Sequence, residues 1–121
     1  MVNDGKMQKI HGHLVGIDQG EVVLFNDYED NGPMWAETGE RSVIKEITFS
    51  ESFDEPPSTT VRLAMCDMSN DAYMRLDLRV EDVTRKGFKI RFNTWGDTKI
   101  ARLRVAWQAI GSVSSDDAWD I

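Results

Sequence analysis

The strongest candidate for chemistry is a tryptophan in a short polar turn, at residues 95–98 with the sequence WGDT. In the segment before the turn, the polar residues Lys89, Arg91 and Asn93 alternate with apolar ones. Trp95 falls in the same alternating row as these polar residues, so its ring is expected on the outside of the fold. One interpretation is that Trp95 covers the end of a hairpin or a subunit contact. The other is a ligand platform, because a flat apolar sugar face stacks on tryptophan while polar neighbours bond its hydroxyl groups. Asp97 either contributes to such a site or holds the turn by bonding the backbone.

The remaining candidates for chemistry are weak. His11 and His13 are two residues apart and could chelate a metal, but ordinary surface residues of a strand have the same pattern. Cys66 is the only cysteine, which excludes an intrachain disulfide, and no histidine lies near it in the sequence to act as a base. The acidic residues of segment 27–30 lack the spacing of a calcium loop. We therefore expect no catalytic residues, no metal site and no cofactor, and no enzymatic activity.

Length and composition indicate one globular domain. The chain has 121 residues, of which 40% are hydrophobic and 29% are charged. A chain of this length and composition can bury a stable core without covalent cross-links. The net charge of −7 argues against binding of nucleic acid. No apolar run approaches the roughly 20 residues of a membrane helix, and the N-terminus lacks the apolar segment of a signal peptide. We expect no membrane insertion, and a protein that acts outside the cell or on a particle surface after release without a signal peptide.

Alternating segments predict strands through most of the chain. In residues 87–111, two arms flank the tryptophan turn and are expected to pair as a hairpin with their apolar rows inward. Residues 73–83 alternate most strictly and are expected to form a neighbouring strand. Residues 10–25 indicate a strand, a turn at residues 18–20 and a second strand. The inward rows of the two arms are Phe88, Ile90 and Phe92, then Leu103, Val105, Trp107 and Ala109.

Three further segments complete the pattern. Residues 26–40 form a long acidic loop whose glycines and proline oppose regular structure, although Met34 and Trp35 are expected to pack. Residues 42–49 and 61–66 alternate again as strands, and the parity of the second places Cys66 away from the core. The tail after residue 111 is polar, and it is either disordered or docked through Trp119.

Six or seven short alternating strands predict an all-β fold, a six- to seven-stranded antiparallel β-sandwich. We expect an N-terminal arm at residues 1–19, the sandwich at residues 20–111 and a C-terminal tail at residues 112–121. If the strands at 73–83, 87–93 and 99–111 share one sheet, its outer face gathers six basic side chains that a partner subunit would help to neutralise. These are Arg75, Arg79, Lys89, Arg91, Arg102 and Arg104.

Several motifs in this pattern resemble the H-type lectin domain, the family of snail agglutinins and of the discoidin lectin module. The TW-x-DT turn at residues 94–98, seven residues after Gly87-Phe88, is the most specific of them. The resemblance covers residues 20–111 and implies a six-stranded sandwich that forms a homotrimer or a dimer of trimers. It also implies calcium-independent binding of sugars, often of N-acetylgalactosamine or galactose type. The other motifs are ITF at residues 47–49, Pro56-Pro57, Arg75 and Val105-Ala106-Trp107.

The resemblance further implies which residues bind the sugar. In such lectins the sugar lies between subunits and contacts the tryptophan of the turn, the residue after it and an arginine from a preceding strand. These positions correspond to Trp95, Gly96 and Arg75. The chain departs from the family at Gly96, which has no side chain to bond the sugar, and in the loop after Trp35, where no matching aspartate can be placed. The candidates from that loop are Glu37, Thr38 and Glu40.

Two functions follow from this pattern. The first is a lectin that recognises cell-surface glycans, as an adhesion or receptor-binding module. The alternative is a structural trimer, a knob or adaptor on a phage tail fibre or spike, with little or no sugar binding. A glycan array separates the two.

Overall fold

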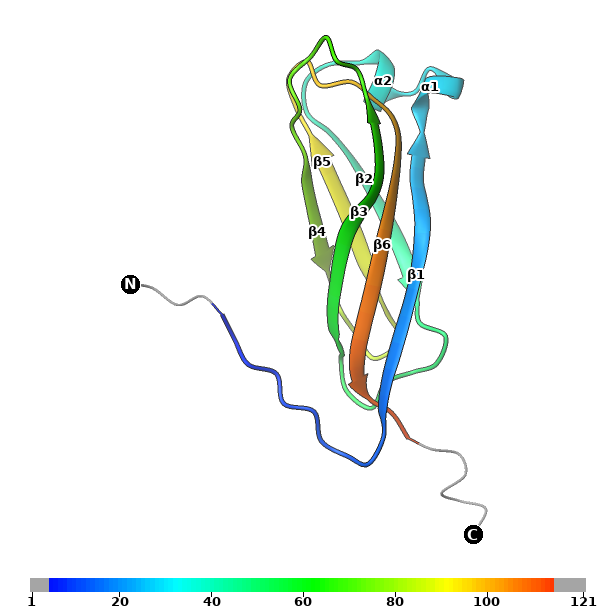
Figure 1. The fold of residues 1–121 in the computed structure, drawn as a ribbon, viewed down its shortest axis with the longest axis vertical. Helices are drawn as coiled ribbons and strands as arrows, with labels where there is room; N and C mark the ends of the chain where they lie inside the picture. The colour runs from blue at the N-terminus through cyan, green and yellow to red at the C-terminus, as the bar shows by residue number, and fades with distance from the viewer. Residues whose placement is uncertain (1–4, 115–121) are drawn as a thin grey trace.

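The computed structural model describes residues 5–114, which form two antiparallel sheets stacked face to face (Figure 1). The first sheet has the order β1 (Val15–Asn26), β6 (Ile100–Ser112) and β3 (Ser58–Met68). The second has the order β2 (Arg41–Thr48), β5 (Gly87–Thr94) and β4 (Asp77–Glu81). Two short helices, α1 (Asp27–Asp30) and α2 (Pro33–Ala36), connect β1 to β2 at one end of the sandwich. The predicted all-β antiparallel sandwich is confirmed.

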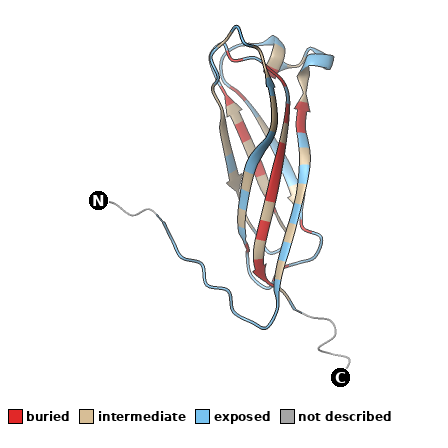
Figure 2. Cartoon of the chain, in the orientation of Figure 1, coloured by how far each residue is buried: buried red, intermediate tan, exposed pale blue. Residues whose placement is uncertain are grey.

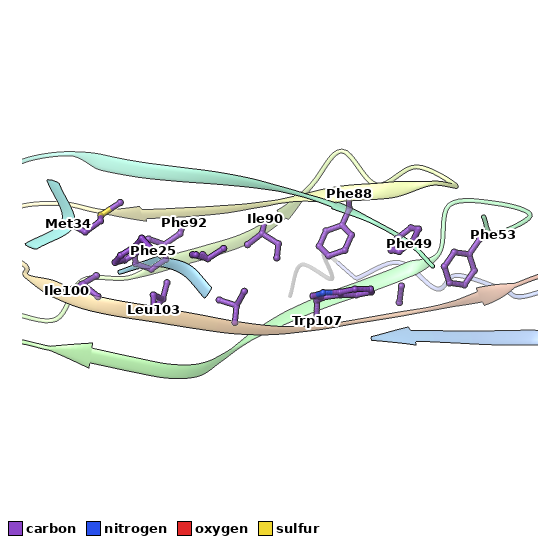
Figure 3. Close-up of a cluster of buried hydrophobic side chains, with 13 residues drawn as sticks. Phe25, Met34, Phe49, Phe53, Phe88, Ile90, Phe92, Ile100, Leu103 and Trp107 are labelled. Carbon is purple, nitrogen blue, oxygen red and sulfur yellow. The ribbon is translucent and has the colours of Figure 1, made fainter. Parts of the chain in front are cut away.

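The core is one continuous row of apolar side chains between the sheets, from Met34 at one end to Phe53 at the other (Figure 3). In β5 every second residue is buried, because one face of the strand meets the opposite sheet. The ring of Phe88 from β5 lies 5.5 Å from that of Trp107 on β6, between ring centroids. Buried positions concentrate on β5 and β6, the central strands (Figure 2). The predicted inward rows of both strands are therefore confirmed.

The expected pairing of these two strands is wrong. β5 pairs with β2 and β4, whereas β6 pairs with β1 and β3, so the tryptophan turn carries the chain from one sheet to the other. Alternation shows which face of a strand is buried but not which strand lies beside it. The two apolar rows therefore meet across the sandwich instead of side by side.

The expectation of one basic face is wrong for the same reason. Arg102 and Arg104 lie in the first sheet, while Lys89 and Arg91 lie in the second. Most of these cations also have acidic partners within the chain. The acidic partners are Asp77 for Arg79, Glu81 for Arg91, Asp82 for Lys89, Asp67 for Arg102 and Glu21 for Arg104. These cations therefore do not form the single basic face that was expected.

The predicted turn at residues 18–20 is also wrong, because β1 runs unbroken from Val15 to Asn26. Gly20 lies opposite Trp107, and a Cβ there would come within 3.0 Å of the indole nitrogen. This glycine is thus required by close packing rather than by a turn. Asp18 accepts hydrogen bonds from the backbone N–H and the hydroxyl of Ser50, at 2.7 and 2.9 Å. It therefore links β1 to the loop that follows β2.

Two predicted segments differ in length or type. The strand expected at residues 73–83 is reduced to β4, because residues 73–76 form a loop held by side chains of the tryptophan turn. The loop at residues 26–40 contains two single helical turns rather than no regular structure. Within it Met34 is 1% exposed and Trp35 is half-buried, so the expected packing is confirmed. None of the helices in residues 5–114 is long and apolar enough to cross a bilayer.

Cys66 packs against the core, contrary to the prediction from its parity. The register of β3 against β6 shifts between Leu63 and Met65, where a bulge reverses the alternation. As a result Cys66 lies opposite Leu103, a buried residue of β6, and is half-buried. The predicted docking of Trp119 falls outside the described residues.

Candidate functional site

The tryptophan turn lies at the end of the sandwich that carries α1 and α2. Trp95 follows β5 directly and is 44% exposed, whereas Thr94 and Thr98 on either side of the turn are buried. The hydroxyl of Thr94 donates to the carbonyl of Arg75, and that of Thr98 donates to the carbonyl of Tyr73, each at 2.6 Å. The two threonines therefore fix the loop before β4 against the turn and leave the indole of Trp95 free.

Arg75 lies on the backbone of this turn. A Cβ at Gly96 would come within 3.0 Å of Nη1 of Arg75, and Gly96 has a φ of +68°, so glycine is favoured on both grounds. Nη1 of Arg75 donates to Oδ1 of Asp97 at 2.6 Å, and its guanidinium carbon lies 5.2 Å from the ring centre of Tyr73. The hydrogen bond from Arg75 lowers the pKa of Asp97. Asp97 is thus a carboxylate that orients Arg75.

Arg41 joins the turn to the segment that follows α2. Its side chain is buried and donates to the carbonyls of Gly39, Thr98 and Gly96, at 2.9, 2.8 and 3.1 Å. Further contacts at 3.3 Å reach the carbonyls of Pro33 and Met34. Burial lowers the pKa of the Arg41 guanidinium, and the charge of Glu37 partly offsets this effect. The backbone N–H of Gly39 also donates to Gly96, at 2.8 Å.

Trp95 borders a surface hollow of about 460 Å³, called here the Trp95 hollow. Carboxylates of Glu40 and Asp77 and the carboxamide of Asn93 line it beside the indole. Asp77 also accepts from Nε of Arg79, at 2.9 and 3.1 Å, and this bond lowers the pKa of Asp77. An exposed indole beside carboxylate and amide groups suits a compound with one apolar face and several hydroxyl groups. The other lining residues are Arg41, Ser42 and Thr94.

The structure brings some of the predicted site residues together and separates others. Glu40 lines the Trp95 hollow, while Glu37 and Thr38 are exposed on the same segment without lining it. Arg75 lies against Gly96, next to Trp95, but does not line the Trp95 hollow. Asp97 borders a different hollow of about 300 Å³, with Asn70, Asp71, Ala72 and Tyr73.

The two histidines lie apart from this region. His11 and His13 are exposed in the arm before β1. Within residues 5–114, no group of three or more histidine, cysteine, aspartate or glutamate side chains is arranged to hold a metal ion.

Several residues of the site were not predicted from the sequence. Thr94 and Thr98 stood within the most specific motif, and their type next to a turn was an available signal for hydrogen bonds to backbone. Arg41 gave no signal, because a single arginine at the start of a strand is ordinarily exposed. Asp77 lies opposite Asn93 because β4 pairs with β5, and this pairing could not be read from the alternation of either strand.

A β-sandwich with an aromatic and polar hollow at one end, and no cluster of catalytic groups apparent in the sequence, has the form of a binding module. Residues 44–110 match the family model of the H-type lectin domain, and the chain belongs to this family. The family and the fold together support a carbohydrate-binding lectin module rather than an enzyme.

Two known proteins are similar to this chain in sequence. A protein of Fuscovulum blasticum described as ATP synthase subunits region ORF 7 is 46% identical over 110 residues, which are 91% of this chain and 96% of that protein. Discoidin-2 of Dictyostelium discoideum is 28% identical over 95 residues, which are 78% of this chain and 35% of discoidin-2.

Solved structures support the fold. Two structures of discoidin II from Dictyostelium discoideum superpose with TM-scores of 0.69 and 0.70, at 23% identity over 80% and 82% of this chain. The matched region is 37% of each discoidin II chain, so this chain spans little more than a third of that protein.

Proposed function

We propose that this protein binds a galactose-type sugar, galactose or N-acetylgalactosamine, in the Trp95 hollow and without calcium. The observation that carries the proposal is the exposed indole of Trp95 beside Glu40, Asp77 and Asn93. The apolar face of a galactose ring would stack on the indole, while the carboxylates and the carboxamide would accept and donate hydrogen bonds to its hydroxyl groups.

In this proposal Arg75 binds the sugar from the side of Gly96. The hydrogen bonds of Arg75 within residues 5–114 all use Nη1, which leaves Nε and Nη2 to donate to a hydroxyl or an acetamido oxygen. Asp97 holds the guanidinium in place, and Gly96 contributes the open space that the guanidinium fills. Glu37 and Thr38, which are exposed near the Trp95 hollow, are the candidates for contact with larger glycans.

We also propose that three copies assemble, as a trimer or a dimer of trimers, with the sugar bound near the contact between subunits. Support comes from the outer face of β1, where Val15, Ile17 and Val23 are each more than half exposed. Val15 and Ile17 are neighbours on this face, and exposed apolar side chains that lie together favour burial against another copy. Such an assembly would present several sugar sites at once, which suits an adhesion or receptor-binding module.

The test is a glycan array followed by calorimetry with the best ligand. Trp95→Ala removes the stacking surface, worth about 1 kcal/mol, and should weaken binding about fivefold or more while the chain stays folded, because the indole is exposed. Arg62→Ala is the matched control, since Arg62 is exposed on β3 in the other sheet. If Trp95→Ala binds as the parent does, the sugar site lies elsewhere.

The same row on β1 also favours the structural alternative, a trimeric knob or adaptor with little sugar binding. Light scattering and the glycan array together distinguish the two functions. A mass of three times 13.8 kDa with no ligand on the array would support the structural function alone. A mass near 13.8 kDa at micromolar concentration would contradict the proposed assembly.

A further inference from the structure

A second hollow at the same end of the sandwich, of about 310 Å³, lies over the sheet of β1, β6 and β3. We call it the Trp35 hollow. Its volume is near the lower limit for small-molecule sites, which suits a single sugar ring better than a peptide. Its walls come from the end of β1, from α1 and α2, and from β3 and β6. The lining residues used below are Asn26, Tyr28, Glu29, Trp35, Asp67 and Arg102.

Two aromatic rings form one wall of the Trp35 hollow. The ring of Tyr28 meets that of Trp35 edge to face, with centroids 5.2 Å apart and an angle of 74° between the rings. Tyr28 is nevertheless 62% exposed. A tyrosine that stays largely open to solvent at the edge of a hollow, held against a half-buried tryptophan, provides a stacking surface for a ligand.

The polar wall has unused capacity to accept hydrogen bonds. Arg102 donates through both Nε and Nη2 to Oδ2 of Asp67, at 3.3 and 3.1 Å, so Oδ1 of Asp67 is left for another donor. Oδ1 of Asn26 is buried and accepts no hydrogen bond from the described residues. A rotation of this carboxamide about its last side-chain bond would present the oxygen or the amide to the Trp35 hollow. A ligand with several hydroxyl groups would satisfy these acceptors.

The charges at the Trp35 hollow favour a neutral ligand. Glu29 and Asp67 are opposed by Arg102 and by Lys99, whose Nζ lies 5.9 Å from the ring centre of Trp35. A cationic ligand would find the face of Trp35 and one carboxylate already engaged by cations of the chain. An anionic ligand would meet the two carboxylates.

We propose that the Trp35 hollow is a second carbohydrate subsite, which binds one neutral hexose unit. The choice of a sugar as ligand rests on the proposed function, while the site itself rests on the contacts of Tyr28, Trp35, Asn26 and Asp67. Arg41 bonds the carbonyls of Met34 and Gly96 and so connects the segments that border the two hollows.

The two hollows can be observed separately by the indole N–H signals of Trp35 and Trp95 in the ¹⁵N-labelled protein of residues 1–121. Trp35→Phe and Trp95→Phe assign the signals, and the probes are galactose, N-acetylgalactosamine and, as a cation, tetramethylammonium. We expect both sugars to shift the Trp35 signal saturably in the parent and in Trp95→Ala. Tyr28→Ala should weaken this response about fivefold, by loss of half of the aromatic wall. Ile44→Ala, an exposed apolar residue of β2, is the control and should leave the response unchanged.

Each other outcome identifies which proposal fails. A sugar response at Trp95 without one at Trp35 overturns the second subsite and retains the proposed function. A response at Trp35 without one at Trp95 supports the second subsite and overturns the site proposed for Trp95. A Trp35 signal that responds to tetramethylammonium alone, or equally in Tyr28→Ala and the parent, overturns the sugar subsite. No sugar response at either indole overturns both proposals.

Discussion

Replacement of Arg41 by methionine tests whether the candidate site is held by this one buried side chain. Methionine keeps most of the apolar stem and removes the guanidinium, which donates to the carbonyls of Gly39, Thr98 and Gly96. A hydrogen bond from a charged donor contributes about 1.5–3 kcal/mol, so three of them set an upper limit of about 5–9 kcal/mol. The end of the sandwich can open and let water reach the freed carbonyls, which reduces the loss. We therefore expect the free energy of unfolding to fall by about 3–5 kcal/mol.

A loss of this size leaves the protein mostly folded at 25 °C when the stability of the parent lies above the lower end of the range of about 5–15 kcal/mol that small domains have. It should lower Tm by about 10 °C or more, measured by circular dichroism. Hydrogen exchange of the Gly39 amide, which donates to Gly96 at 2.8 Å, should accelerate more than exchange in the centre of β6. Arg62→Met, at an exposed position of β3, is the control for loss of an arginine. A Tm within about 3 °C of the parent, with unchanged Gly39 exchange, would refute the role given to Arg41.

Two further predictions concern single side chains. Cys66→Ser should lower the free energy of unfolding by about 1–2 kcal/mol, measured by urea denaturation, because it places a hydroxyl where a half-buried thiol packs on the core. An unchanged urea midpoint would show instead that the side chain of residue 66 points away from the core, as its parity suggested. Burial, with the charge of Asp67, also raises the pKa of the Cys66 thiol, so the native protein should react slowly with thiol reagents near neutral pH. The pKa of Asp97 is lowered by Arg75, so its contribution to stability is present above the ordinary value of about 3.9 and is lost as acid protonates it. The Tm difference between parent and Asp97→Asn should therefore be present above about pH 4 and disappear towards pH 2, and a difference that persists in acid would contradict this coupling.

The buried faces of the strands could be predicted from sequence, whereas the pairing of strands could not. Phe88, Ile90 and Phe92 alternate with polar residues, and this alternation identifies the face that is removed from water. The same pattern is produced by a hairpin and by two strands that face each other across a sandwich. The assignment of β5 and β6 to different sheets depends on long-range pairing with β2 and β1, which local alternation does not encode.

The error at Cys66 has a similar cause. A bulge between Leu63 and Met65 reverses the alternation within β3, and neither residue type marks its position. The site could be predicted only in part, because its residues come from segments whose arrangement local patterns do not reveal. An exposed tryptophan could be inferred from parity, but the Trp95 hollow depends on Glu40, Asp77 and Asn93, which come from three separate segments.

The construction of the turn separates the residues that hold the site from the residues available to bind a ligand. Thr94, Thr98 and Arg41 are buried, and the hydrogen bonds that their side chains donate within residues 5–114 go to backbone carbonyls. A carbonyl is present at every residue, so this framework places little demand on the side chains around it. Trp95, Glu40 and Asn93 reach the surface with few bonds to the framework. If the Trp95 hollow binds sugar as proposed, sugar preference can therefore change through its side chains while the turn keeps its shape.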